Sequence, residues 1–161
     1  MRGGVLAAAL LCAALGIALA FAPARSRPAC LVLLMVSSAT AFALGAPASL
    51  SGAVFLVGWL SVMACAASVH LPKGLPAALA ILLSIDAGLC AGSLIALEGR
   101  GLDLPLAWCG AGTLALSALA VRWRLAIAAK VASSWLIAIA VLAAALPYLP
   151  VTPGYLPDHL E

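Results

Sequence analysis

Charged residues are scarce in this sequence. Eight Lys and Arg and five Asp and Glu make up 8% of the 161 residues. Soluble proteins carry about 25% charged residues, so this chain has too little polar surface to coat a water-soluble core of its size. No polar stretch is long enough to build a second domain. The scarcity of charge therefore argues against a soluble globule and predicts that lipid surrounds most of the chain.

Catalytic motifs are also absent from the sequence. It contains no GxSxG, HExxH or P-loop pattern and no pair of carboxylates within one apolar segment. Neither of the two histidines lies in the middle of an apolar run, which argues against histidine-ligated haem. We therefore predict that the protein is not an enzyme and that it carries no cofactor.

The cysteines and basic residues form no recognisable binding pattern. The odd total of five cysteines, with no CxxC pair, argues against a disulfide framework or a structural zinc site. The net charge of +3 is spread singly or in pairs between apolar runs, so nucleic acid is not predicted as a partner. The predicted partner is the lipid bilayer, together with other membrane subunits or further copies of the chain.

Apolar runs dominate what the sequence does contain. Hydrophobic residues make up 66% of the chain, and they occur in runs of about 16 to 25, the length that crosses a hydrocarbon layer roughly 30 Å thick. The fold class predicted is all-α, a polytopic transmembrane bundle of about six short helices joined by short antiparallel hairpin loops. The predicted spans are Val5–Ala22, Ala29–Ala46, Gly52–Val69, Leu75–Leu97, Leu106–Val121 and Leu125–Leu149. Residues 1–149 form this bundle, and 150–161 form an extended, proline-rich C-terminal tail.

The first apolar run also resembles a secretory signal peptide, because Arg2 precedes it and Ala20-Phe-Ala22 resembles a cleavage site. Charge placement favours a retained helix. With the N-terminus outside the cytoplasm, six basic residues fall on the inside and two, Arg2 and Arg100, outside, as the positive-inside rule requires. The six are Arg25, Arg27, Lys73, Arg122, Arg124 and Lys130. We predict a bacterial inner-membrane protein with both termini on the non-cytoplasmic side.

Asp86 is the most informative residue because it lies near the middle of the predicted span Leu75–Leu97. A charge at that depth costs roughly 2.5–3.5 kcal/mol on insertion scales. Asp86, Cys90 and Ser93 recur at i, i+4 and i+7, which places them on one face of the helix. That face is predicted to look into the bundle. Asp86 is either a proton- or cation-binding carboxylate on a transport path or a hydrogen-bonded acid that ties helices together, and both interpretations stay open.

The last span supplies the remaining candidates. Ser133 and Ser134 reach closer to the depth of Asp86 than Lys130 does, so hydrogen bonds between the fourth and sixth spans are predicted. The predicted substrate or ion path thus comprises Asp86, Cys90, Ser93, Ser133 and Ser134. Residues predicted to serve helix packing are Gly88 and Gly92, whose spacing allows close approach of another helix, with Lys130 and Trp135. No metal site is assigned.

The segment from Arg124 to Ile139, with its Ala-Ser-Ser-Trp core, resembles the closing helix of HupE/UreJ-type membrane proteins. Upstream, Leu83-Ser-Ile-Asp-Ala-Gly88 and Leu97-Glu-Gly99 look like the penultimate helix and loop of some members. The resemblance implies a bundle of six or seven helices that passes nickel or a related divalent ion. That function is usually attached to an early helix bearing His-Pro and Asp-His pairs, and this sequence has neither pair.

Two functions follow from these observations. The leading hypothesis is a permease-like inner-membrane protein that passes a small solute or a divalent metal ion along the Asp86 face. The alternative is a non-catalytic accessory subunit whose helices pack against a larger membrane complex. The second has weight because polar residues within the spans are few and 161 residues leave little room for an alternating-access cycle.

Overall fold

The computed structural model describes residues 3–149, with side chains from Val5 onward, and these residues form helices without any strand. The predicted C-terminal tail, 150–161, lies outside the described residues. The elements are α1 (Gly3–Leu19), α2 (Arg27–Leu44), η1 (Ala48–Leu50), α3 (Ser51–Ser68), α4 (Ala77–Glu98), α5 (Asp103–Cys109), η2 (Gly110–Gly112), α6 (Thr113–Arg122), α7 (Ala126–Ala145) and η3 (Leu146–Tyr148). The predicted all-α fold class is confirmed.

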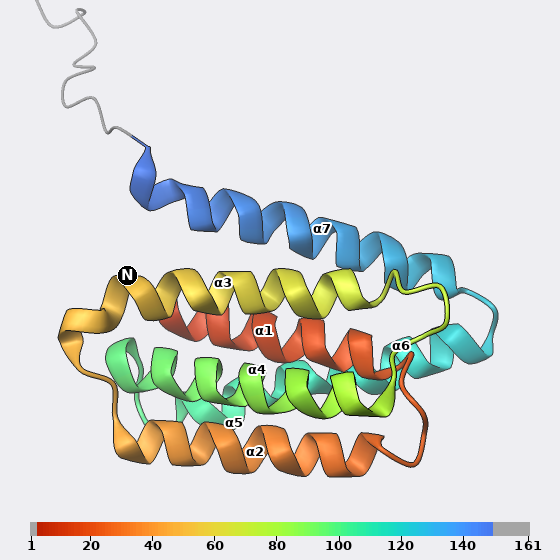
Figure 1. Ribbon diagram of the computed structural model, residues 1–161, viewed down its shortest axis with the longest axis horizontal. Coiled ribbons are helices and arrows are strands. Elements are labelled where there is room, and N and C mark those ends of the chain that lie inside the picture. Colours follow the sequence, from red (N-terminus) through yellow and green to blue (C-terminus); the bar gives the residue numbers. More distant parts are fainter. Residues whose placement is uncertain (1–2, 150–161) are drawn as a thin grey trace, which may run out of the picture.

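Successive helical segments run in opposite directions along the bundle (Figure 1). Five of them are long and apolar enough to cross a membrane: Arg27–Leu44, Ala48–Ser68, Ala77–Glu98, Asp103–Arg122 and Ala126–Tyr148. By length and composition the chain is a multi-pass membrane protein. The first predicted span, Val5–Ala22, is shorter in the structure, where α1 ends at Leu19 and its apolar part, Val5–Leu19, falls below that length.

Helix α1 is the centre of the bundle. It packs against α3, α4 and the α5–α6 segment, and it also contacts α7. Its side chains are apolar on every side, as expected of a largely buried helix, and Leu11, Leu15 and Leu19 are fully buried. A cut after Ala22 would therefore remove the element on which α3, α4 and the α5–α6 segment pack.

Helices α2 and α4 make the most extensive contact in the bundle. At their crossing Gly88 and Gly92 of α4 face the α2 backbone. A Cβ atom added at Gly88 would lie 2.7 Å from the Leu34 carbonyl oxygen, and one added at Gly92 would lie 2.9 Å from Ala41 Cβ. The absence of side chains at both positions is thus what allows the two backbones to approach.

Arg27 closes the end of α1. Its Nη2 donates to the Ala20 carbonyl at 2.9 Å and to the Ala22 carbonyl at 3.1 Å, and its Nε donates to the latter at 3.2 Å. These carbonyls follow the last turn of α1, where a helix lacks intrahelical donors and where a cation is favoured by the helix dipole. The guanidinium therefore holds the start of α2 against the end of α1.

The fifth membrane segment is not one continuous α-helix. Its α-helical turns stop at Cys109, continue as the 3₁₀ turn Gly110–Gly112, and resume at Thr113. This turn lies on α1, where an added Cβ at Gly110 would meet the Ala9 carbonyl oxygen at 2.5 Å. Thr113 Oγ1 donates to the Ala13 carbonyl of α1 at 2.8 Å. The break lets the chain follow α1 and turn away from α2 over its second half, because α5 contacts α2 whereas α6 packs on α1 and α7.

Candidate functional site at Asp86

Asp86 lies near the middle of α4 and is held by α3. Nine residues separate it from the start of α4 at Ala77, about 14 Å along the axis at 1.5 Å per residue. Ser61 of α3, which is buried, donates a hydrogen bond from Oγ to Asp86 Oδ2. Cys90, one turn further along α4, places its sulfur 3.9 Å from Oδ1. The carboxyl group is thus anchored at the α3–α4 contact.

The carboxyl group is half-buried at the surface of the bundle rather than enclosed within it. Its neighbours on the same face of α4, Leu82 and Leu89, are 63% and 46% exposed, and Val57 of α3 is 48% exposed. On the face that was predicted to look into the bundle, Cys90 is buried, whereas Asp86 and Ser93 are partly exposed at the edge of the α3–α4 contact.

A shallow groove of about 220 Å³ continues from this point along the α3–α4 boundary. Cys90 and Ser93 line it together with apolar side chains of α3, and it ends beside Leu50 at the start of that helix. The structure therefore brings three of the predicted path residues, Asp86, Cys90 and Ser93, to one surface. The groove opens toward the exterior, because Leu50 and Leu89 beside it are exposed.

The other two predicted path residues lie elsewhere. Ser133 donates to the Ala129 carbonyl at 2.9 Å and Ser134 to the Lys130 carbonyl at 3.1 Å, so both hydroxyls bond within α7. Helix α7 packs mainly on α3, whereas α4 packs on α2, α1 and α3. Among the described residues, the hydrogen bonds predicted between the fourth and sixth spans are not formed, because α3 occupies the position beside α4.

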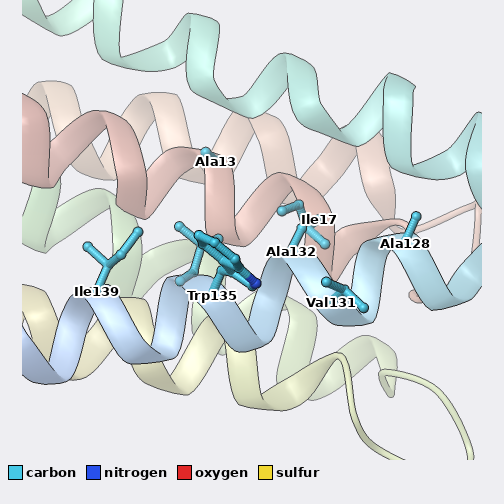
Figure 2. A pocket seen from close by; sticks show the side chains of 8 residues that line it. Ala13, Ile17, Ala128, Val131, Ala132, Trp135 and Ile139 are labelled. Carbon is cyan, nitrogen blue, oxygen red and sulfur yellow. The ribbon is translucent and has the colours of Figure 1, made fainter.

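Lys130 and Trp135, the residues of α7 predicted to serve packing, are both largely exposed. Lys130 is exposed, and the Trp135 side chain is 70% exposed. Figure 2 shows Trp135 on α7 at an apolar groove whose opposite wall is α1, at Ala13 and Ile17. The groove measures about 640 Å³ and its lining is almost entirely apolar. Its chemistry matches lipid chains and offers no polar group for a solute.

No continuous polar seam runs through the described part of the bundle. Apart from Ser61, the buried hydroxyl groups with a hydrogen bond described here donate within their own helices, as Ser84 does to the Ala80 carbonyl at 2.7 Å and Ser68 to the Cys65 carbonyl at 2.7 Å. Hydroxyl groups can bond to their own helix carbonyls without any role in a site. Residues 3–149 contain no group of three His, Cys, Asp or Glu side chains that could hold a metal ion.

Several polar contacts between helices were not predicted from the sequence, among them the Thr113–Ala13 hydrogen bond described above. One is Ser61, which lies in the third span with Gly58 and Cys65, so that small residues at i, i+3 and i+7 form a stripe that could have identified it. Another is Trp108, whose Nε1 donates to Ser38 Oγ of α2 at 3.0 Å.

No family model, curated protein or solved structure matches this chain.

Proposed function

We propose that the protein is a non-catalytic subunit that binds another membrane protein within the bilayer, through the face of α3 and α4 around Asp86. The observation that supports it is the position of the carboxyl group, at mid-depth and half-buried on the outer surface. A carboxyl group facing hydrocarbon is costly, and intramembrane acids nearly always pair with another group. Ser61 satisfies only part of its hydrogen-bonding capacity.

The occupant proposed for this face is a transmembrane helix that carries a hydrogen-bond donor or a basic side chain at mid-depth. Flanking side chains on the face, such as Leu82, Leu89 and Val57, supply an apolar contact surface. A second copy of the chain is the weaker candidate, because an interface made by the same face on both copies would bring a second Asp86 toward the first. Like groups in contact oppose association unless a proton is shared.

The proposal is tested by photo-crosslinking in native membranes. A benzophenone amino acid at Leu89, beside Asp86, is expected to give one discrete adduct whose mass exceeds that of the chain by the mass of the partner. The matched control is the same amino acid at Leu116 of α6, which is 71% exposed and lies on a different helix. An adduct at twice the chain mass of 16.0 kDa would show that the partner is a second copy of the chain. Identical behaviour at the two positions would overturn the proposal.

We further propose that the membrane orientation follows the basic residues. Arg25, Lys73 and Arg122 lie in or next to loops at one end of the bundle, and Glu98 and Asp103 lie at the other (Figure 1). The positive-inside rule then places the first end in the cytoplasm and both termini outside it. Alkaline phosphatase, which is active only outside the cytoplasm, is expected to be active when fused after Leu149 and inactive when fused within 70–74. The reverse pattern of activity would show that the basic end of the bundle lies outside the cytoplasm and would contradict the proposed orientation.

Permease-like transport of a proton or small solute is the second candidate. It is favoured by the groove lined by Cys90 and Ser93, which leads from the end of the bundle at Leu50 toward Asp86. The resemblance of Arg124–Ile139 to HupE/UreJ-type proteins stays a hypothesis that fits either function. The two functions differ in whether flux through the isolated protein depends on Asp86.

A further inference from the structure

A further groove, between α2 and the α5–α6 segment, combines a basic end with an apolar wall. It measures about 440 Å³ and is bounded by α2 on one side and by α5, η2 and α6 on the other. Arg27 stands at one end, and Leu31 and Met35 follow it at intervals of four residues along the same face of α2. From the α5–α6 side the lining comes from Trp108, Ala111, Gly112, Leu114 and Ala115.

The broken helix creates this groove. The whole segment packs on α1, and Trp108 also holds α5 to α2 through Ser38, but after the 3₁₀ turn Gly110–Gly112 the second neighbour is α7 rather than α2. The gap left between α2 and α6 starts at the end of the bundle that carries the basic loops. From Arg27 to Met35 it extends over eight residues, about 12 Å at 1.5 Å per residue, which is close to half of a hydrocarbon layer roughly 30 Å thick.

The charges around the opening are all positive. Arg27 uses Nε and Nη2 on the carbonyls that end α1, so the N–H groups on Nη1 have no acceptor among the described residues. Arg122 is seven residues beyond the lining residue Ala115, which puts both on one face of α6. The acidic side chains in residues 3–149 are Asp86 at mid-depth and Glu98 and Asp103 at the opposite end of the bundle.

From this combination we infer that the groove between α2 and α6 is a binding site for one anionic phospholipid of the leaflet at the basic end. The phosphate would lie at Arg27 and Arg122, and an acyl chain would run along Leu31, Met35 and Leu114. Basic pockets between transmembrane helices are the usual sites of anionic headgroups. A zwitterionic lipid could fill the same apolar wall, but its headgroup would gain less from the two arginines.

Gly112 provides a variant that fills the groove without disturbing the bundle. An added Cβ would meet nothing within 4 Å, and the backbone, at φ −59° and ψ −18°, suits any L-residue. Gly112→Leu should therefore compete with the acyl chain. Gly52→Leu is the matched control, since it too lies in open space, on α3 and away from the groove.

The test is native mass spectrometry of the full chain released from bilayers of phosphatidylcholine with or without phosphatidylglycerol. The unsubstituted protein is expected to retain one phosphatidylglycerol and to lose phosphatidylcholine. Gly112→Leu should reduce that retention at least tenfold, while Gly52→Leu leaves it unchanged. Retention by Gly112→Leu equal to that of the unsubstituted protein, or equal retention of both lipids, would overturn the inference.

A charge variant tests the headgroup without touching the packing. Arg122→Gln is expected to weaken phosphatidylglycerol retention about fivefold, which corresponds to about 1 kcal/mol for one basic residue near an anionic surface. Arg100→Gln removes the same charge at the other end of the bundle and should have no effect. Equal effects of the two substitutions would show that only overall charge matters and would contradict a site at the α2–α6 groove.

Discussion

Replacing Asp86 with leucine should release the protein from its membrane partner and leave the bundle itself at least as stable. The substitution is made together with Ser61→Ala, so that the buried hydroxyl does not lose its acceptor. One hydrogen bond between membrane helices contributes about 1–2 kcal/mol in model peptides, so co-purification of the partner in mild detergent should fall about 5- to 30-fold. Thermal unfolding of the isolated protein should not move to lower temperature, since a carboxyl group is withdrawn from an apolar surface.

Two controls sharpen this prediction. Leu82→Ala alters the same face of α4 at an exposed side chain and should reduce co-purification far less, because only packing is lost. Asp86→Asn keeps the size of the side chain and removes the acid. If the partner is recovered equally with and without Asp86, the subunit hypothesis fails. If Asp86→Asn also abolishes proton or solute flux in vesicles that contain the isolated, folded protein, transport becomes the better account.

Enlarging Gly92 should have the largest effect on folding. An added Cβ would collide with the carbonyl oxygen of Ser38 on α2 and would lie 3.0 Å from the carbonyl carbon. These are backbone atoms, so no side chain can rotate away, and the two helices must separate. Overpacking of a well-filled core costs typically 1–3 kcal/mol, and a backbone collision at the most extensive helix contact puts Gly92→Val at or above the upper end of that range.

The measurement is unfolding of the purified protein in detergent mixtures with increasing SDS. Gly92→Val should unfold at a markedly lower SDS fraction than the unsubstituted protein, whereas Gly52→Val, in open space on α3, should be unchanged. Gly88→Ala should lie between them, because part of its collision is with the Ser37 side chain, which Ser37→Gly removes. Equal unfolding of Gly92→Val and Gly52→Val would mean that α2 and α4 do not meet at this point.

The spans could be predicted because hydropathy and length are local properties. The predicted segment Ala29–Ala46 corresponds to α2 at Arg27–Leu44, and Leu75–Leu97 to α4 at Ala77–Glu98. The 3₁₀ turn in the fifth segment could not be predicted in the same way, since the glycines at 110 and 112 flank an alanine in a run that stays apolar throughout. Its 3₁₀ turn depends on contact with α1, which no local pattern encodes.

The candidate site could be predicted only in part. A lone aspartate in an apolar run identified residue 86, and the helix period correctly grouped Cys90 and Ser93 with it. The partner helix was predicted as the sixth span but is α3, through Ser61. The depth of a residue in the membrane can be counted along the sequence. Which helices become neighbours depends on the side-chain shapes of both helices. Depth alone therefore could not choose between Ser61 and Ser133 as the partner of Asp86.

By itself, the sequence determined that this chain consists of membrane-length helices in an up-and-down order, with its basic loops at one end and one acid at mid-depth. These properties follow from the transfer of each segment out of water, which depends on its own composition. Only the tertiary structure decided that α1 is the central helix, that α2 lies on Gly88 and Gly92, and that Asp86 lies partly exposed at the edge of the α3–α4 contact. Those outcomes depend on which surfaces fit together, and within lipid, steric fit rather than hydrophobicity selects the neighbours of a helix.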